Sequence, residues 1–263
     1  MAASREQTHF VLVHGLCLGA WCWHKLKPRL EATGHRVTVL DLAASGINMK
    51  AIQDVHTFYD YTRPLLNLLA SLAPNEKVVL VGHSLGGVNL ALAMDEYPEK
   101  VAVGVFLTAL MPDTTHKPSY VLDKYVEGTP AENWLDTQFS SVGSANHPLT
   151  SVLFGPNFLS SMLYQLSPIE DLELAKTLVR PGSLFREDLS KAKNFSKKGY
   201  GSVQRVYVVC DDDLAIPKEF QKWMIENSGL KDVMEIKGAD HMAMVSKPQE
   251  LYHRLLEIAH KYA

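Results

Sequence analysis

The sequence predicts an α/β fold with a mostly parallel central sheet, helices on both faces of that sheet and an inserted helical lid. Short apolar, β-rich runs alternate with helical patterns from His9 to Leu110 and again from Gly201 to Lys261. Such alternation is typical of a parallel sheet covered on both faces. The length of 263 residues suits one domain. We expect a core of residues 1–111 and 198–263 and a lid of residues 112–197.

The first elements follow a simple order. The apolar run His9–Val13 predicts a buried strand, and residues Trp21–Thr33 predict a helix that Gly34 caps. Residues Arg36–Leu42 predict the next strand. Residues Thr57–Leu72 place leucines on one side of an amphipathic helix. These segments form the first repeats of the strand-and-helix pattern.

The stretch from Val78 to Gly87 organises the chain. An apolar strand ends abruptly in Gly-x-Ser-x-Gly, with Ser84 at its centre, and Val88–Tyr97 then has a helical pattern. This strand-turn-helix context is that of a nucleophile elbow, in which small neighbours let the serine hydroxyl project above the sheet. An ordinary glycine-rich turn is the alternative. The context predicts that Ser84 is a catalytic nucleophile.

Two backbone amides are candidates for stabilising an oxyanion. The Leu85 amide lies at a predicted helix N-terminus, where backbone donors have no partner within the helix. The Leu16 amide lies in the loop His14-Gly15-Leu16 after the first strand and can supply the second donor. Each well-placed donor contributes roughly 10²–10³ in rate.

The remaining elements divide into the lid and the end of the core. In the lid, prolines separate the short helical segments Tyr120–Glu127, Ala131–Phe139, Asn157–Leu166 and Ile169–Leu178. The core resumes with the strands Gly201–Cys210 and Val233–Ile236 and the helices Pro217–Ser228 and Pro248–Lys261; Val101–Leu110 is the strand before the lid.

A serine nucleophile needs a base, and the base needs a carboxylate that orients it. In this architecture the chain order is Ser, then Asp or Glu, then His. His241 follows the last strand and is the candidate base, and Asp211-Asp212-Asp213 follow the strand before it. Spacing leaves the choice among the three aspartates open. Asp113 is a rival acid, and Asp240 is expected to shape the turn.

The motifs HFVLVHG, GAWCW, LDLAASGIN, VLVGHSLGG, TPAENWLDTQF, LVRPGSLF and KGADHMAM resemble those of the plant methylesterase and hydroxynitrile lyase family of α/β-hydrolases. The similarity runs from about His9 to Tyr262. It implies the α/β-hydrolase fold, no cofactor, a cytoplasmic location and a homodimer. It also implies methyl esters of small carboxylic acids as substrates, such as methyl salicylate, methyl jasmonate or methyl indoleacetate.

The resemblance assigns further residues. The acid of the family falls on Asp213. Residues that would line the substrate pocket are Tyr125, Trp134, Phe154, Leu184 and Met242. Leu16 and Leu110 depart from the residues usual in salicylate-type esterases, so the pocket is expected to differ in shape.

Two other functions compete with ester hydrolysis. A hydroxynitrile lyase would use the same triad as a base, but related lyases carry a threonine at the position of Gly15 and a lysine at the position of Met242. A methionine cannot supply the positive charge that supports a leaving cyanide. A non-catalytic binder of a small hormone acid is the second alternative, although it would not need a triad.

Composition excludes other classes. The net charge of −3 argues against nucleic acid or an anionic membrane as partner. The polar N-terminus Met1–Thr8 lacks the apolar core of a signal peptide, and no apolar run is long enough to span a membrane. The odd count of three cysteines suggests free thiols in a reducing compartment. No metal-binding motif is present, so no metal site is expected.

Overall fold

The computed structural model describes residues 7–144 and 147–263, so the first six residues of the polar N-terminal segment lie outside it. Its centre is a six-stranded sheet in the order β2-β1-β3-β4-β7-β8, in which every pairing is parallel. The strands are β1 (His9–Val13), β2 (Arg36–Leu40), β3 (Val78–His83), β4 (Val101–Leu107), β7 (Gln204–Cys210) and β8 (Val233–Ile236). The predicted parallel sheet is confirmed.

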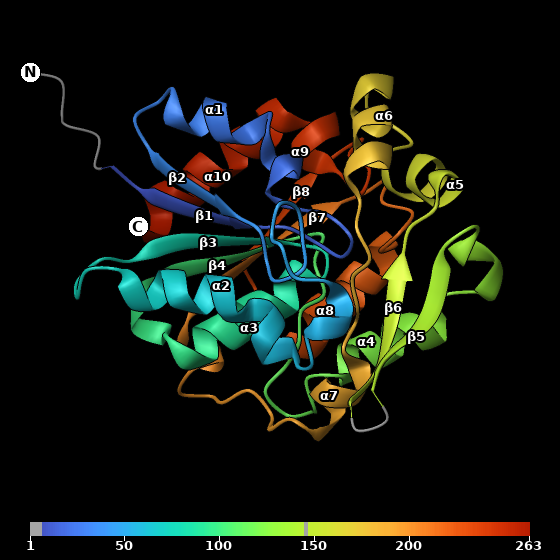
Figure 1. Cartoon of the computed structure of the whole chain (residues 1–263). Helices are drawn as coiled ribbons and strands as arrows, with labels where there is room; N and C mark the ends of the chain where they lie inside the picture. Colours follow the sequence, from blue (N-terminus) through green and yellow to red (C-terminus); the bar gives the residue numbers. More distant parts are fainter. Residues whose placement is uncertain (1–6, 145–146) are drawn as a thin grey trace, which may run out of the picture.

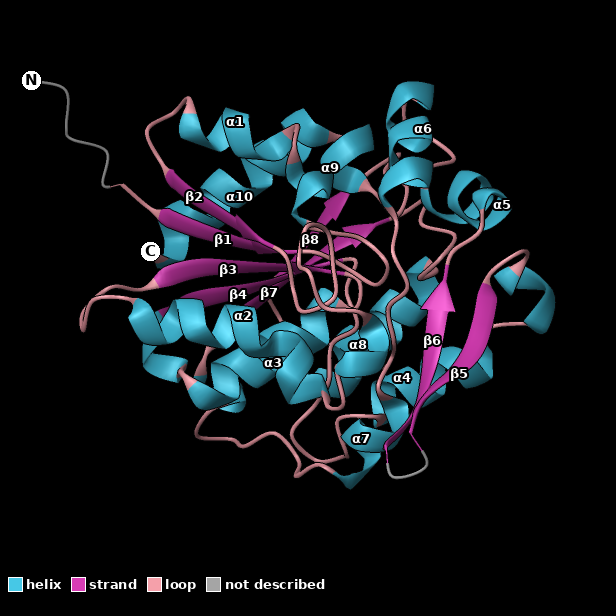
Figure 2. Ribbon diagram, viewed as in Figure 1, coloured by secondary structure: helices cyan, strands magenta, loops and turns pink. Residues whose placement is uncertain are grey.

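Helices cover both faces of the sheet (Figure 1, Figure 2). On one face lie α2 (Phe58–Ser71), α3 (Gly86–Glu96) and α8 (Lys218–Ser228), and on the other lie α1 (Leu26–Glu31), α9 (Ala243–Ser246) and α10 (Pro248–Tyr262). Among the described residues, no helix is long and apolar enough to cross a membrane.

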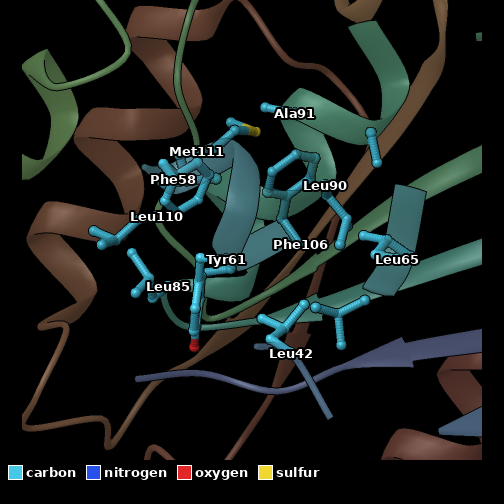
Figure 3. Close-up of a cluster of buried hydrophobic side chains, with 14 of the residues drawn as sticks. Leu42, Phe58, Tyr61, Leu65, Leu85, Leu90, Ala91, Phe106, Leu110 and Met111 are labelled. Atoms are coloured by element: carbon cyan, nitrogen blue, oxygen red, sulfur yellow. The ribbon is translucent and has the colours of Figure 1, made fainter. Parts of the chain in front are cut away.

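Alternate residues of each strand point to opposite faces and divide the core into two clusters. Val11 and Val13 pack with α2 and α3, whereas Phe10 and Leu12 pack with α1 and α10. Figure 3 shows the first cluster, in which side chains of α2 and α3 gather around Phe106 of β4. These strands are buried on both sides, which explains their continuous apolar sequences.

The register brings several strand ends to one edge. Val13 of β1 pairs with Gly82 of β3, and His83 pairs with Leu107 of β4. The carboxyl ends of the strands therefore lie together, and the elements inserted between β4 and β7 lie beyond this edge (Figure 1). Loops at this edge are the usual place for a site in an open α/β sheet.

The inserted segment is less helical than the sequence suggests. It contains α4 (Tyr120–Gly128), α5 (Pro156–Phe158), α6 (Ile169–Leu178) and α7 (Arg186–Lys191), together with an antiparallel hairpin of β5 (Gln138–Ser144) and β6 (His147–Leu153). The helix expected over Ala131–Phe139 is wrong. A 3₁₀ turn ends at Trp134, Leu135 has a φ of 48°, and the chain continues into β5. A positive φ is incompatible with a continuing helix.

Two smaller expectations also need correction. The helix expected over Trp21–Thr33 is a 3₁₀ turn, Ala20–Trp23, followed by α1, which has Pro28 near its start. The segment Asn157–Leu166 is the short α5 followed by a π-helical turn over Leu159–Leu163. Gly34 follows α1 with a φ of 91°, in accord with its expected role as a cap.

Candidate active site

Ser84 stands in the tight turn between β3 and α3. Its φ is 56°, a left-handed conformation that non-glycine residues seldom adopt. A Cβ atom on Gly82 would lie 2.8 Å from the Gly86 carbonyl oxygen, and one on Gly86 would lie 2.8 Å from the His14 carbonyl oxygen. Only glycine fits at both positions, so the Gly-x-Ser-x-Gly pattern is a steric requirement of this turn.

The turn is fixed by its own backbone. The carbonyl oxygen of Ser84 accepts hydrogen bonds from the amides of Leu110, at 2.9 Å, and Gly87, at 3.1 Å. Within residues 7–144 and 147–263, the amides of Leu16 and Leu85 donate to no protein acceptor. Both residues line one cavity with Ser84. Two unpaired donors beside a hydroxyl are the arrangement that an oxyanion hole requires.

His241 and Asp213 form a buried pair. The Nδ1 atom of His241 lies 2.7 Å from Oδ2 of Asp213, and the two residues are each only 3% exposed. Because a carboxylate accepts hydrogen bonds, Nδ1 carries a proton, and in the neutral imidazole Nε2 is then the nitrogen with the free lone pair. His241 lines the same cavity as Ser84. The imidazole is thus held in the tautomer that can accept a proton.

Further hydrogen bonds fix the Asp213 carboxylate. Its Oδ1 accepts from the amides of Ala215, at 2.8 Å, and Ile216, at 2.9 Å. Its Oδ2 also accepts from the hydroxyl of Thr108, which follows β4. Thr108 has a φ of 35°, a strained conformation for a β-branched residue. The strained backbone of Thr108 thus occurs at the residue whose hydroxyl donates to the Asp213 carboxylate.

His83 contacts both the backbone and the ring of His241. Its Nε2 donates to the His241 carbonyl oxygen at 2.8 Å, and the ring centroids are 4.5 Å apart. Burial, together with the neighbouring His241, lowers the pKa of His83 well below its usual range. His83 therefore stays neutral beside the candidate base.

The other candidate acids have different partners. The Asp113 carboxylate accepts from His116 Nδ1 and Asn227 Nδ2, each at 2.7 Å, and it is not paired with His241. Asp211 accepts from the Gly238 amide. Asp240 is fully buried, and its carboxylate accepts from the Met242 amide within its turn and from the Leu166 amide of the inserted segment.

The cavity at Ser84, here called the inner cavity, has a volume of about 30 Å³. Four of the residues expected in the substrate pocket line it, namely Tyr125, Trp134, Phe154 and Leu184. Met242 does not line it and is fully buried in the second core cluster. The expectation that Met242 lines the pocket is therefore wrong. Although Met242 is next to His241 in the sequence, its side chain packs into the core.

Other residues of the inner cavity were not expected from the sequence. They are Phe158, Leu163, Ala215 and Ile216; Leu110, expected only to alter the shape of the pocket, also lines it. Ala215 and Ile216 lie two and three residues after Asp213, and that proximity was the one sequence signal that could have identified them. Tyr125 donates from its hydroxyl to the Ala215 carbonyl oxygen at 2.9 Å, which links the inserted segment to this loop.

Comparison with known proteins agrees with this architecture. Residues 10–254 match the α/β hydrolase family. This chain therefore belongs to the α/β hydrolase family.

Individual relatives narrow the comparison. The chain is 61% identical to salicylic acid-binding protein 2 of Nicotiana tabacum, over 98% of this chain and 99% of that protein. It is 57% identical to methylesterase 1 of Arabidopsis thaliana over the full length of both chains. The crystal structure of polyneuridine aldehyde esterase superposes with a TM-score of 0.94 at 54% identity, covering 97% of this chain and 100% of the other. The recognised resemblance to plant methylesterases is confirmed.

Proposed function

We propose that this protein is a serine carboxylesterase that hydrolyses methyl esters of small carboxylic acids, including plant hormone or specialised-metabolite esters. The observation that carries the proposal is the buried His241–Asp213 pair on the cavity that Ser84 lines. The names of the relatives, among them a methylesterase and polyneuridine aldehyde esterase, support the same reaction.

The chemistry follows from the assigned roles. His241 Nε2 takes the proton of the Ser84 hydroxyl as the oxygen attacks the ester carbonyl. The amides of Leu16 and Leu85 stabilise the oxyanion, and Asp213 stabilises the imidazolium. His241 then protonates the departing methanol, which leaves an acyl-enzyme. A water molecule activated by His241 releases the acid and restores Ser84.

Residues 112–197 are proposed to act as the lid of this site. They leave and rejoin the sheet at β4 and β7, which are neighbours in it. They also supply Tyr125, Trp134, Phe154 and Leu184 to the inner cavity. A lid that excludes water strengthens the electrostatic contacts within the site.

A cytoplasmic location and a homodimer belong to the same proposal. Cys17, Cys22 and Cys210 are buried and free, which suits a reducing compartment. Sedimentation of the purified protein at several concentrations measures its oligomeric state, and a single monomer species throughout would remove the dimer from the proposal.

The decisive experiment compares the wild-type protein with Ser84→Ala and with the surface control Ser71→Ala. The panel contains methyl salicylate, methyl jasmonate, methyl indoleacetate and mandelonitrile. We expect methyl ester turnover in the wild-type protein and in Ser71→Ala and none in Ser84→Ala. Unchanged turnover in Ser84→Ala would refute the mechanism. Cyanide release from mandelonitrile without ester turnover would favour a lyase, and tight binding of a free acid without any turnover would favour a binding protein.

A further inference from the structure

A second, larger cavity adjoins the inner one. It has a volume of about 380 Å³ and is called here the outer cavity. Its lining comes from the hairpin β5–β6, from α4 and from the segment that leads into α7. A volume of 300–1,000 Å³ is usual for small-molecule sites, and the inner cavity is far below that range. Of the two cavities, only the outer one has room for the acyl part of a substrate.

Trp134 and Leu184 line both cavities and separate them. The Trp134 ring meets Phe139 of the outer cavity edge-on, with centroids 5.3 Å apart. On its inner side it stacks on Phe158 at 6.0 Å, nearly parallel. Trp134 ends a 3₁₀ turn, and Leu135 after it has the strained φ of 48°. Trp134 and Leu184 are the residues that the two cavities share.

The outer cavity suits a neutral, apolar occupant. Its apolar lining residues are Val126, Trp134, Phe139, Pro148, Leu149, Val152, Leu184 and Phe185. Its charged lining groups already have partners inside the protein.

Three contacts account for those charges. The Arg186 guanidinium pairs with Asp123 at 2.8 Å. The Glu187 carboxylate pairs with Lys191 at 2.8 Å. The Asp188 carboxylate accepts from the Phe58 amide at 2.8 Å. Two of these charges are therefore paired with an opposite charge, and the third is hydrogen-bonded to the backbone, so none of them needs a charged occupant as its partner.

We propose that the two cavities form one substrate site, in which the ester group lies at Ser84 and an extended, uncharged acyl body passes between Trp134 and Leu184 into the outer cavity. This proposal rests on the proposed function and extends its substrate class to methyl esters whose apolar acyl part is longer than a single ring or short chain. Rotation of the Trp134 and Leu184 side chains opens the passage.

The test fills the outer cavity and leaves the inner one untouched. Ser141 and Thr150 are cross-strand neighbours in the hairpin and both line the outer cavity. The variants are Ser141→Trp and Thr150→Trp, with Ser140→Trp as the matched control. Ser140 is adjacent to Ser141 in the strand, so its side chain points to the opposite face of the hairpin. The substrates are methyl octanoate and methyl butanoate.

We expect the ratio of kcat/KM for methyl octanoate to that for methyl butanoate to fall at least about tenfold in the two filling variants. One tenfold step corresponds to about 1.4 kcal/mol, within the range of burying one or two methylene groups. The ratio should stay at the wild-type value in Ser140→Trp. A ratio that is unchanged in both filling variants, or that falls equally in the control, overturns the proposal.

Binding to the Ser84→Ala protein separates this proposal from the proposed function. Calorimetry gives the Kd of methyl octanoate for Ser84→Ala and for the double variant Ser84→Ala/Thr150→Trp. Binding that weakens about tenfold in the double variant supports the outer cavity even if the wild-type protein hydrolyses neither ester. In that case only the proposed function fails. Equal binding to both variants overturns the shared site.

Discussion

The imidazole of His83 holds the backbone of His241: its Nε2 donates to the His241 carbonyl oxygen at 2.8 Å, and the two rings lie 4.5 Å apart. His83 directly precedes Ser84 in the chain. One residue therefore connects the turn of the proposed nucleophile to the loop of the proposed base.

Removing that donor should impair the reaction. In His83→Phe the buried His241 carbonyl loses its hydrogen-bond donor, which lowers the free energy of unfolding by about 1–3 kcal/mol. We expect kcat to fall about tenfold or more, because the proposed base His241 is no longer held in place, while KM changes less. His83→Gln retains a side-chain N–H donor and should recover part of the loss. Equal kcat values for the wild-type protein and His83→Phe would show that the contact does not position the base.

Buried neutral histidines should make stability depend on pH. Burial lowers the pKa of both His14 and His83 below the ordinary value of 6.5. In the unfolded chain these groups protonate as the pH falls through 6.5, whereas in the folded protein they stay neutral. The unfolded state then binds more protons, so the free energy of unfolding falls toward low pH by up to about 1.4 kcal/mol per pH unit for each histidine.

Urea unfolding between pH 8 and pH 5 measures this dependence. The free energy of unfolding should be nearly flat above about pH 7.5 and should decline below about pH 6.5. The slope should be smaller in His83→Gln. The carboxylates with lowered pKa values, such as Asp113, lose their contribution only at a lower pH. An identical slope in the variant would mean that His83 titrates alike in both states.

Replacing the proposed orienting acid should nearly abolish activity. Asp213→Asn keeps the shape but favours the wrong tautomer of His241, and we expect kcat to fall on the order of 10⁴. Asp113→Asn is the matched control, because that carboxylate is bonded to His116 and Asn227 instead. Steady-state kinetics on a methyl ester compares the two. A loss below about tenfold in Asp213→Asn would move the acid role elsewhere.

The glycines of the elbow should tolerate no side chain. A Cβ on Gly86 would lie 2.8 Å from the His14 carbonyl oxygen and 2.9 Å from that of Val13. We expect Gly86→Ala to lower the free energy of unfolding by about 1–3 kcal/mol and to reduce kcat. At Gly128, which ends α4, an added methyl group would have no neighbouring atom within 4 Å. Thermal unfolding should show Gly128→Ala unchanged or slightly stabilised.

The core of the fold could be predicted from the sequence because its strands are buried on both faces. Runs such as Phe10–Val13 and Val78–Val81 are apolar throughout, and few structures other than a parallel sheet bury such runs at this length. The strand-turn-helix motif around Ser84 could be predicted equally well. Gly82 and Gly86 are needed there because a side chain at either position would collide with the backbone, and this holds for any chain that forms this turn.

The hairpin of the inserted segment could not be predicted in the same way. The strand Gln138–Ser144 has the sequence QFSSVGS, which carries little apolar alternation, and its pairing with β6 is a tertiary contact. The choice of Asp213 over Asp211 and Asp212 depended on the family resemblance. Three adjacent aspartates differ only in where the backbone points each carboxylate, and sequence spacing does not report that direction.

The position of the inserted segment has a consequence for how this protein can change. Because the segment begins after β4 and ends before β7, which are adjacent strands, both of its junctions fall on one rim of the sheet. A segment from a relative could be exchanged as a cassette through these two junctions, leaving Ser84, Asp213 and His241 on the retained framework. The part of the cavity lining that comes from the inserted segment can therefore change in evolution while the proposed triad, and the core residues that share the lining, stay in place.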